Sequence, residues 1–215
     1  MPGGSHKEIE IKLRVDDAAG LLAQLRELRA TRQSRVFESN TLFDSPDGAL
    51  MKRDSLLRLR WEVPAPSGSS PAQIAHGLRQ KNLVTGSRSW LTYKGRGNRA
   101  GRYKVREELE LAIGEPDTLA ALLKAMGFQP AFRYEKVRTR FHLPQVSGVA
   151  VELDETPIGT YMELEGFPRS IDRAARLLHR APRDYITASY YVLYSNFCRR
   201  HRCPIRHMVF SSRKS

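Results

Sequence analysis

The stretch that decides the fold is Glu8-Ile9-Glu10-Ile11-Lys12, which is followed directly by Leu13. Alternate side chains share a face in an extended strand, so Glu8, Glu10 and Lys12 point one way while the apolar residues point the other. Two carboxylates about 7 Å apart on one face repel each other by roughly 2 kcal/mol at an effective dielectric constant near 20. The stretch therefore indicates either a half-buried strand with a solvated charged face or a buried acidic pair that needs a metal ion or basic neighbours.

Similar alternation recurs along the chain. It predicts strands over residues 35–43, 55–61, 90–94, 103–111, 132–141, 149–153 and 161–165. Many of their charged faces carry one sign only. The acidic sets are Glu8/Glu10, Glu152/Asp154 and Glu163/Glu165, and the basic sets are Arg58/Arg60 and Lys136/Arg138/Arg140. Because like charges are unfavourable beside one another on a sheet, this separation suggests that the charged faces surround a bound ligand.

Four segments have helical periodicity, at residues 16–28, 116–126, 171–179 and 185–198. Residues 63–89 are rich in Pro, Gly, Ser, Gln and Asn, which predicts a flexible hairpin insertion with a short helix after Pro71. The glycine-rich segment 95–101 lacks the spacing and the following helix of a nucleotide-binding loop. We therefore interpret it as a hairpin turn.

The 215 residues suit one domain, and the formal net charge of +13 predicts an anionic partner. The charge alone allows nucleic acid, a phosphate-rich small molecule or an acidic surface. We assign part of the excess to the run from Arg199 to Lys214, predicting a solvated basic tail over residues 201–215, and the rest to the strands.

The chain has neither an apolar stretch of about 18 residues nor the apolar core of a signal peptide, so we expect a cytoplasmic protein with no membrane segment. Its two cysteines, Cys198 and Cys203, fit a reducing compartment. Together with His201 and His207 they do not follow a standard zinc spacing. The five arginines between residues 199 and 213 would also repel a cation, which argues against a metal site there.

About eight strands with four covering helices would form an α+β fold in which a closed antiparallel barrel turns its charged faces inward. Such a lumen suits a triphosphate, whose charges would pair with inward lysines and arginines. The expected inward bases are Lys12, Arg58, Arg60, Lys94, Arg106 and Arg138. The carboxylates cannot contact phosphate directly, but they are suitable ligands for Mg²⁺ or Mn²⁺, which would bridge them to phosphate oxygens.

With these charged residues, the sequence resembles the CYTH domains of the triphosphate tunnel metalloenzymes. Glu8-x-Glu10-x-Lys12 matches the N-terminal signature of that family. The further motifs, in order, are Asn40-Thr-Leu-Phe-Asp44, Leu57-Arg58-Leu-Arg60, Thr92-Tyr-Lys94-Gly95, Arg106-x-Glu108-x-Glu110, Lys136-x-Arg138, Asp154-Glu-x-Pro-x-Gly159 and Glu163-x-Glu165-Gly166. The resemblance covers residues 6–200.

The resemblance implies an eight-stranded antiparallel tunnel, dependence on Mg²⁺ or Mn²⁺ and a triphosphate-containing substrate. The implied metal ligands are Glu8, Glu10, Glu108, Asp154, Glu163 and Glu165. The implied substrate-binding residues are Lys12, Arg58, Arg60, Lys94, Arg106, Lys136 and Arg138. Among these residues we expect Lys12, Lys94 and Glu10 to be catalytic. One of Glu108 and Glu110 has the alternative role of orienting a neighbouring base.

Three functions follow as hypotheses. The first is hydrolysis of inorganic triphosphate, a nucleoside triphosphate or thiamine triphosphate, and the second is conversion of ATP to cyclic AMP and pyrophosphate. The third is a non-catalytic module that binds polyphosphate or nucleic acid. The acidic pairs would repel a phosphate backbone, so we do not expect nucleic acid to be the partner. A homodimer is possible.

Overall fold

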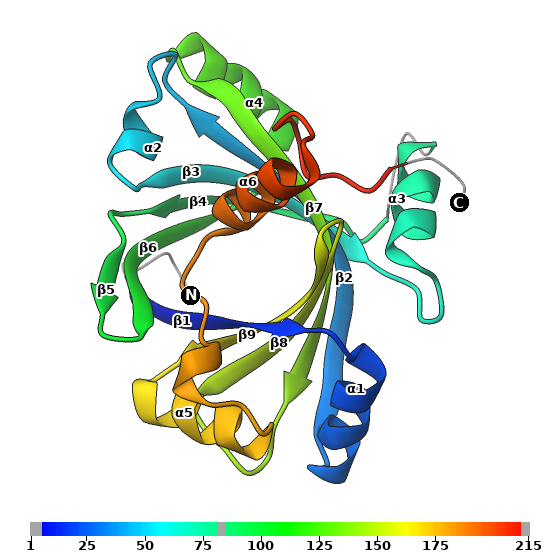
Figure 1. The fold of residues 1–215 in the computed structure, drawn as a ribbon. Helices are drawn as coiled ribbons and strands as arrows, with labels where there is room; N and C mark the ends of the chain where they lie inside the picture. The colour runs from blue at the N-terminus through cyan, green and yellow to red at the C-terminus, as the bar shows by residue number, and fades with distance from the viewer. Residues whose placement is uncertain (1–5, 81–84, 212–215) are drawn as a thin grey trace.

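The computed structural model describes residues 6–80 and 85–211, and an antiparallel sheet that closes on itself forms its centre. The strands are β1 (His6–Val15), β2 (Thr31–Asp44), β3 (Leu56–Pro64), β4 (Arg88–Lys94), β5 (Asn98–Ala100), β6 (Tyr103–Ile113), β7 (Gln129–His142), β8 (Val149–Thr156) and β9 (Gly159–Gly166). They pair in the order β1-β9-β8-β7-β2-β3-β4-β6, and β6 pairs with β1 to close the ring (Figure 1). The short β5 extends one edge of β6. The predicted α+β fold with a closed eight-stranded antiparallel barrel is confirmed.

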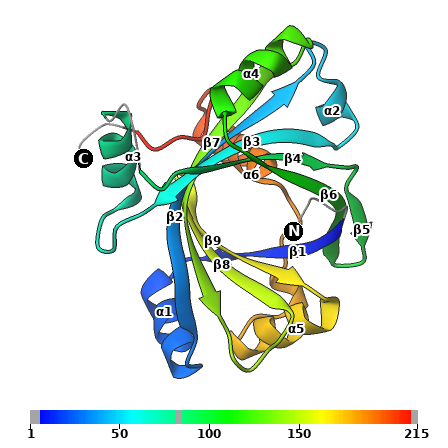
Figure 2. The same ribbon diagram turned by 180° about the vertical axis from the view of Figure 1, so that it is seen from behind.

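Six α-helices and one 3₁₀ turn lie around this barrel in the described part of the chain (Figures 1 and 2). They are α1 (Ala18–Glu27), α2 (Ala49–Lys52), α3 (Pro71–Arg79), α4 (Pro116–Ala125), α5 (Pro168–Leu177), η1 (Pro182–Asp184) and α6 (Tyr190–His201). The four predicted helices and the short helix after Pro71 are present, whereas α2 was not predicted. Within residues 6–80 and 85–211, no helix has the length and apolar character needed to span a membrane.

The last helix begins at Tyr190 and not at Tyr185, where its apolar spacing placed it. Ser189 caps the helix by accepting a hydrogen bond from the amide of Val192. Before that cap, the backbone of Ile186 exchanges two hydrogen bonds with Lys12 of β1. The segment before α6 is therefore held in extended form by the barrel.

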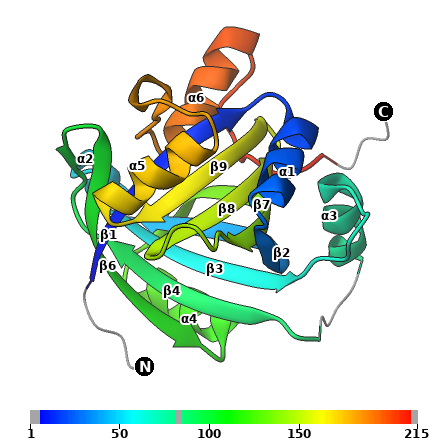
Figure 3. The ribbon, with the colours of Figure 1, turned by 90° about the horizontal axis from the view of Figure 1, so that it is seen from below.

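The main apolar core lies between the outer face of the barrel and two helices. Leu21 and Leu25 of α1 and Ile171 of α5 pack with residues of β1, β8 and β9, including Ile11. Figure 3 shows both helices on this side of the barrel. The apolar faces thus point outward, which leaves the inner faces for charge. The helical cover is incomplete, because Leu111 on the outer face of β6 is 59% exposed.

A second cluster holds the insertion against the barrel. Ile74 and Ala75 of α3 are buried together with Phe37 and Val63 of the neighbouring strands. The capping box formed by Ser70 and Gln73 fixes the start of α3. The two apolar residues at the far end of the predicted insertion, Leu83 and Val84, lie outside the described residues.

The prediction of a solvated C-terminal tail is wrong for residues 208–210. Met208 is fully buried, and its amide donates a hydrogen bond to the backbone carbonyl of Arg133 on β7. The Glu135 carboxylate accepts hydrogen bonds from the amide of Phe210 and from Arg79 of α3. Two apolar side chains within the basic run thus fasten the segment to the barrel, although residues 202–207 are exposed as expected.

Candidate active site

The inner face of the barrel is built from cross-strand rows that contain charges of both signs. Lys12 of β1 lies opposite Glu163 of β9, which lies opposite Glu152 of β8, and Glu152 in turn lies opposite Arg140 of β7. The two ends of this row pair opposite charges, whereas Glu163 and Glu152 place two like charges beside one another, which is unfavourable without further cations. The rows surround a cavity of about 420 Å³ inside the barrel.

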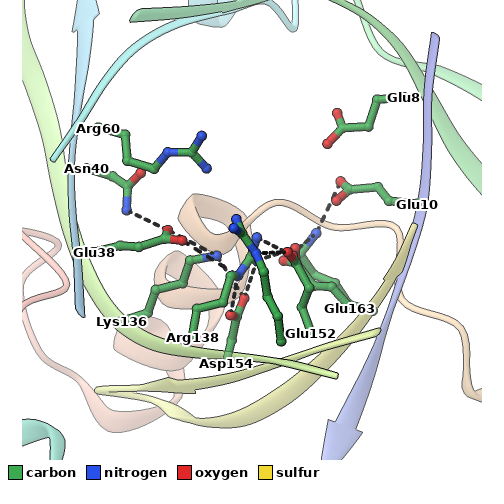
Figure 4. A network of polar contacts seen from close by, with 12 residues as sticks. Glu8, Glu10, Glu38, Asn40, Arg60, Lys136, Arg138, Glu152, Asp154 and Glu163 are labelled. Atoms are coloured by element: carbon green, nitrogen blue, oxygen red, sulfur yellow. Dashed lines mark hydrogen bonds and ion pairs between the residues drawn. The ribbon is translucent and has the colours of Figure 1, made fainter. Parts of the chain in front are cut away.

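Arg138 is the most highly connected cation of this surface (Figure 4). Its guanidinium donates to both oxygens of Asp154 and to Glu163, each at 2.6 Å, and it also pairs with Glu152. Although burial opposes its charge, these carboxylates raise the pKa of Arg138 well above its usual value. Arg138 is therefore a fixed positive charge in the barrel wall.

Asp154 lies behind Arg138 and is fully buried. Besides Arg138, its carboxylate accepts hydrogen bonds from Lys136 at 2.8 Å and from the hydroxyl of Tyr190 at 2.7 Å. Tyr190 belongs to α6, so Asp154 ties this helix to the two cations. With these donors around it and no place in the cavity lining, Asp154 orients the site and is poorly placed to bind a ligand.

A second group of charges is centred on Glu10. Its carboxylate lies 3.1 Å from the Lys12 ammonium and 2.8 Å from that of Lys104. Burial opposes ionisation of Glu10, but the two lysines hold its pKa well below the usual range. Burial likewise opposes the charge of Lys12, whereas Glu10 and Glu163 raise its pKa. Lys12 is thus a permanent cation at neutral pH and is unsuited to be a general base.

The third group joins β1, β3, β4 and β6. Lys94 contacts Glu8 at 2.5 Å and Glu108 at 3.0 Å. Arg58 has looser contacts, with Thr92 at 3.2 Å and with Glu108 at 3.8 Å. Its Nε atom is buried without a hydrogen-bond partner, and so are the Nε atoms of Arg60 and Arg106. Unsatisfied buried donors of this kind suit an anionic ligand with several oxygens.

Arg60 and Arg106 reach the cavity from two sides, but each already has an acidic partner. Arg60 donates to Glu110 at 2.8 Å, and Arg106 donates at 2.5 Å to Asp54, which precedes β3. The Asp54 side chain is 65% exposed, so solvent weakens its pull on Arg106. Glu110 therefore orients Arg60. This is the alternative role predicted from the sequence for one of Glu108 and Glu110.

Glu165 differs from the other inward carboxylates, because it forms no ion pair with any described residue. Burial and the nearby charges of Glu8 and Glu152 raise its pKa to about 8. The pKa of Glu8 is also raised, first by burial and then by neighbouring acids, although Lys94 opposes the shift. Glu8, Glu10, Glu152 and Glu165 form what we call the carboxylate cluster. Basic partners hold Glu8, Glu10 and Glu152, so Glu165 is the member whose charge would be balanced by a divalent cation with oxygen ligands.

No three Asp, Glu, His or Cys side chains among residues 6–80 and 85–211 are arranged to hold an ion by themselves. Oxygen ligands from outside the protein would have to complete the coordination, which is common for Mg²⁺. Several predicted metal ligands have basic partners, since Glu163 pairs with Lys12 and Arg138 while Glu108 pairs with Lys94.

The structure brings the predicted site residues together. All of them line the cavity except Asp154, which lies behind it. Sequence reasoning missed three residues. They are Lys104, Tyr190 and Glu38, a fully buried carboxylate 3.5 Å from the Lys136 ammonium. Lys104 shares the alternating face of Arg106, which was a usable signal. Glu38 lies in a strand with irregular alternation, and Tyr190 comes from a helix remote in sequence.

The assignment of excess positive charge to the strands is wrong. Nine lysines and arginines line the cavity together with nine aspartates and glutamates. The cavity lining is therefore formally neutral, and the net charge of +13 arises elsewhere in the protein. Arg138 and Arg140 of β7 lie opposite Asp154 and Glu152 of β8, a pairing that the sequence of a single strand cannot show.

Comparison with known proteins agrees with this geometry. The family model described as the CYTH domain matches residues 6–183. A protein from Methanocaldococcus jannaschii, named as a candidate adenylate cyclase, is 22% identical over 172 residues, which cover 80% of this chain and 83% of that protein.

Solved structures share the fold. The PH1819 protein of Pyrococcus horikoshii has a TM-score of 0.67 at 22% identity, with coverage of 88% of this chain and 99% of that one. A Hippeastrum protein described as a candidate adenylyl cyclase with a dominant triphosphatase activity has a TM-score of 0.60 at 20% identity, with coverage of 88% and 96%. At such identities the likeness shows the fold alone. Because the family model matches most of the sequence, the chain belongs to the CYTH domain family.

Proposed function

We propose that the protein hydrolyses a triphosphate-containing small molecule inside the barrel with the help of a divalent cation, Mg²⁺ or Mn²⁺. The observation that carries the proposal is that one cavity wall holds both fixed cations and a carboxylate without a basic partner. Arg58, Lys136 and Arg138 supply fixed positive charge, while Glu165 of the carboxylate cluster forms no ion pair with any described residue. A triphosphate and a cation together complement these groups.

The phosphate chain would lie against the basic residues. The buried Nε donor of Arg58 and its loose ion pairs leave this side chain free to turn toward phosphate oxygens. Lys12 and Lys94 would stabilise negative charge that develops on the transferred phosphoryl group and the leaving group. Both lysines are held in place by carboxylates, so no reorganisation is needed during reaction.

The cation would be held by Glu8, Glu10 and Glu165, and Glu152 would contribute negative charge beside them. When bound, it would neutralise phosphate charge and lower the pKa of coordinated water. Glu10 is the most firmly ionised of these carboxylates, because Lys12 and Lys104 flank it. Glu163 and Asp154 would keep Arg138 oriented.

Conversion of ATP to cyclic AMP is the second candidate, because the Methanocaldococcus jannaschii relative bears the name of a candidate adenylate cyclase. The two reactions differ in which phosphorus atom meets the nucleophile. Incubation of the purified protein with Mg²⁺ and either ATP or inorganic triphosphate, followed by product analysis, separates them. We expect orthophosphate without cyclic AMP; cyclic AMP as the main product would refute hydrolysis.

Two variants test the site in the same assay. Glu10→Gln should lower kcat by at least roughly 100-fold, since it removes a ligand of the cation. Glu27→Gln is the matched control, because Glu27 is exposed on α1 and far from the cavity lining. Triphosphate binding that is unaffected by a chelator, with no turnover, would instead favour a non-catalytic binding module.

A further inference from the structure

The cavity changes in character along its length. The inward residues of β7, in order, are Phe132, Tyr134, Lys136, Arg138 and Arg140, all of which line the cavity. Alternate residues along a strand are about 7 Å apart. One strand thus leads from an aromatic end to a cationic interior. A ligand that fills the cavity should have an apolar part and an anionic part in the same order.

We call the apolar end of the cavity the apolar mouth; it consists of Leu42, Leu50, Met51, Leu56, Tyr191 and Val192. Met51 is 49% exposed and Val192 is 42% exposed. Tyr191 also packs edge-on against Phe132, with 5.1 Å between the ring centroids. Apolar side chains from β2, α2, β3 and α6 therefore gather at one end of an otherwise charged cavity, where an apolar ligand group would remove them from water.

The helix on one side of the mouth is fixed by the barrel. The Asp44 carboxylate at the end of β2 accepts hydrogen bonds from the amides of Leu50 and Met51, both at 2.9 Å. This contact gives a physical role to the last residue of the Asn40–Asp44 motif. It holds the first turn of α2 so that Leu50 and Met51 face the cavity.

The helix on the other side is fixed by Tyr190, whose hydroxyl donates to Asp154. The Tyr190 ring also lies 5.4 Å from the Lys12 ammonium and 5.3 Å from that of Lys136. The next two residues, Tyr191 and Val192, then reach the mouth. All three lie beyond residue 183, where the family match ends. This half of the mouth therefore lies outside the matched family region.

We propose that the apolar mouth binds the organic group of the substrate, so that the substrate is an organic triphosphate and not inorganic triphosphate. This inference rests on the proposed function for the position of the phosphates. The triphosphate occupies the cationic interior, and the attached organic group packs against Met51, Tyr191 and Val192. Inorganic triphosphate has nothing to place there.

The carboxylates and Ser189 around the mouth are already engaged. Ser189 caps α6, Asp44 binds the backbone of α2, and Asp54 pairs with Arg106. The hydroxyls of Ser55 and Tyr191 are the other polar side-chain groups there, so recognition of the organic group depends mainly on apolar contact. Apolar contact discriminates weakly between groups of similar size. We expect ATP and GTP to differ by less than about tenfold in kcat/KM.

The test compares kcat/KM for ATP, GTP, thiamine triphosphate and inorganic triphosphate in the wild type and in Met51→Ser and Val192→Ser. At least one organic triphosphate should exceed inorganic triphosphate by about tenfold or more. Each variant should reduce that preference severalfold. Met126→Ser is the matched control, since Met126 is 64% exposed on the outside at the end of α4, and it should change nothing.

The inference would be overturned if kcat/KM for inorganic triphosphate equalled that for the best organic triphosphate. It would also be overturned if the mouth variants lowered kcat/KM equally for all four substrates. Titration calorimetry with the same four compounds and Mg²⁺ gives dissociation constants, which compare the compounds by binding alone and not by catalysis. If no compound is hydrolysed but an organic triphosphate binds at least tenfold more tightly than inorganic triphosphate, hydrolysis fails and the mouth assignment stands. Equal binding without hydrolysis refutes both.

Discussion

Glu10 on β1 and Glu165 on β9 lie directly opposite each other in the barrel wall. Like charges in this position are unfavourable, and the two carboxylates respond differently. Lys12 and Lys104 keep the pKa of Glu10 low, whereas burial and the acids around it raise the pKa of Glu165 to about 8. This unbalanced pair is the part of the inner surface that most needs an added positive charge.

The raised pKa of Glu165 predicts a pH-dependent gain of stability in Glu165→Gln. Between the usual value of 4.5 and about 8, the folded protein keeps a proton that the unfolded chain releases. The stability that Glu165 contributes is therefore lost as the pH rises through this range. In the presence of a chelator, we expect the substitution to raise Tm by about 2 °C or more at pH 9 and to change it little at pH 5.

Thermal unfolding of both proteins at the two pH values measures this effect. The control is Glu27→Gln, which removes an exposed carboxylate of α1 and should leave the pH dependence unchanged. A gain in Tm that is equal at pH 5 and pH 9 would show that Glu165 does not titrate as described.

We expect Arg138 to act mainly in stability and Arg58 mainly in substrate binding, so alanine variants of the two should have different effects. Arg138→Ala leaves Asp154 and Glu163 buried without their main partner, and we expect the free energy of unfolding to fall by about 3–5 kcal/mol. Arg58→Ala removes looser contacts and should instead raise KM by roughly 10- to 100-fold. Chemical denaturation and steady-state kinetics of both variants check this; similar losses of stability would contradict the assignment.

The hydroxyl of Tyr190 should contribute to the stability of α6 on the barrel. Tyr190→Phe removes a hydrogen bond to the buried carboxylate of Asp154 and should cost about 1.5–3 kcal/mol of unfolding free energy. Tyr194→Phe is the control, since the Tyr194 hydroxyl bonds the exposed backbone carbonyl of His207 at 3.2 Å and should matter by less than about 0.5 kcal/mol. Denaturant titrations that give equal costs would exclude this role of Tyr190.

Glu135 should hold the C-terminal segment on the outside of the barrel. Its carboxylate accepts the amide hydrogen of Phe210 at 3.0 Å and also pairs with Arg79 and Arg133. Glu135→Gln weakens all three contacts, so hydrogen exchange at the Phe210 amide should accelerate by roughly tenfold or more. Glu62→Gln, which affects a buried carboxylate paired with Arg88, should leave this amide unchanged. An unchanged exchange rate in Glu135→Gln would rule out the proposed contact.

Much of the barrel could be predicted because charge and apolarity alternate with a period of two along its strands. The alternation at Glu8–Lys12 identified which face turns inward, and the same rule placed Arg58 and Arg138 correctly. It could not show that Glu165 lies opposite Glu10, because strand register depends on pairing between remote segments. Nor could it predict α2, whose four residues depend on hydrogen bonds to Asp44.

The site was predicted less completely than the fold for a related reason. Asp154 belongs to one of the motifs shared with the CYTH domains and was therefore predicted to bind a metal ion. Its carboxylate instead accepts hydrogen bonds from Lys136, Arg138 and Tyr190. Tyr190 lies in the helix predicted over residues 185–198, and Met208 lies in the segment predicted to be a solvated tail. Their burial results from tertiary contacts that local sequence does not contain.

The central claim is that a triphosphate and a divalent cation share the cavity, with the cation at the carboxylate cluster. The most direct measurement is a crystal structure of the protein with Mn²⁺ and a non-hydrolysable triphosphate analogue, in which anomalous scattering locates manganese. We predict a manganese peak within bonding distance of carboxylate oxygens of Glu10 and Glu165 and of the analogue, whose phosphates contact Arg58 and Arg138. Manganese and analogue bound only on the outer surface, with the cavity empty of both, would contradict the account.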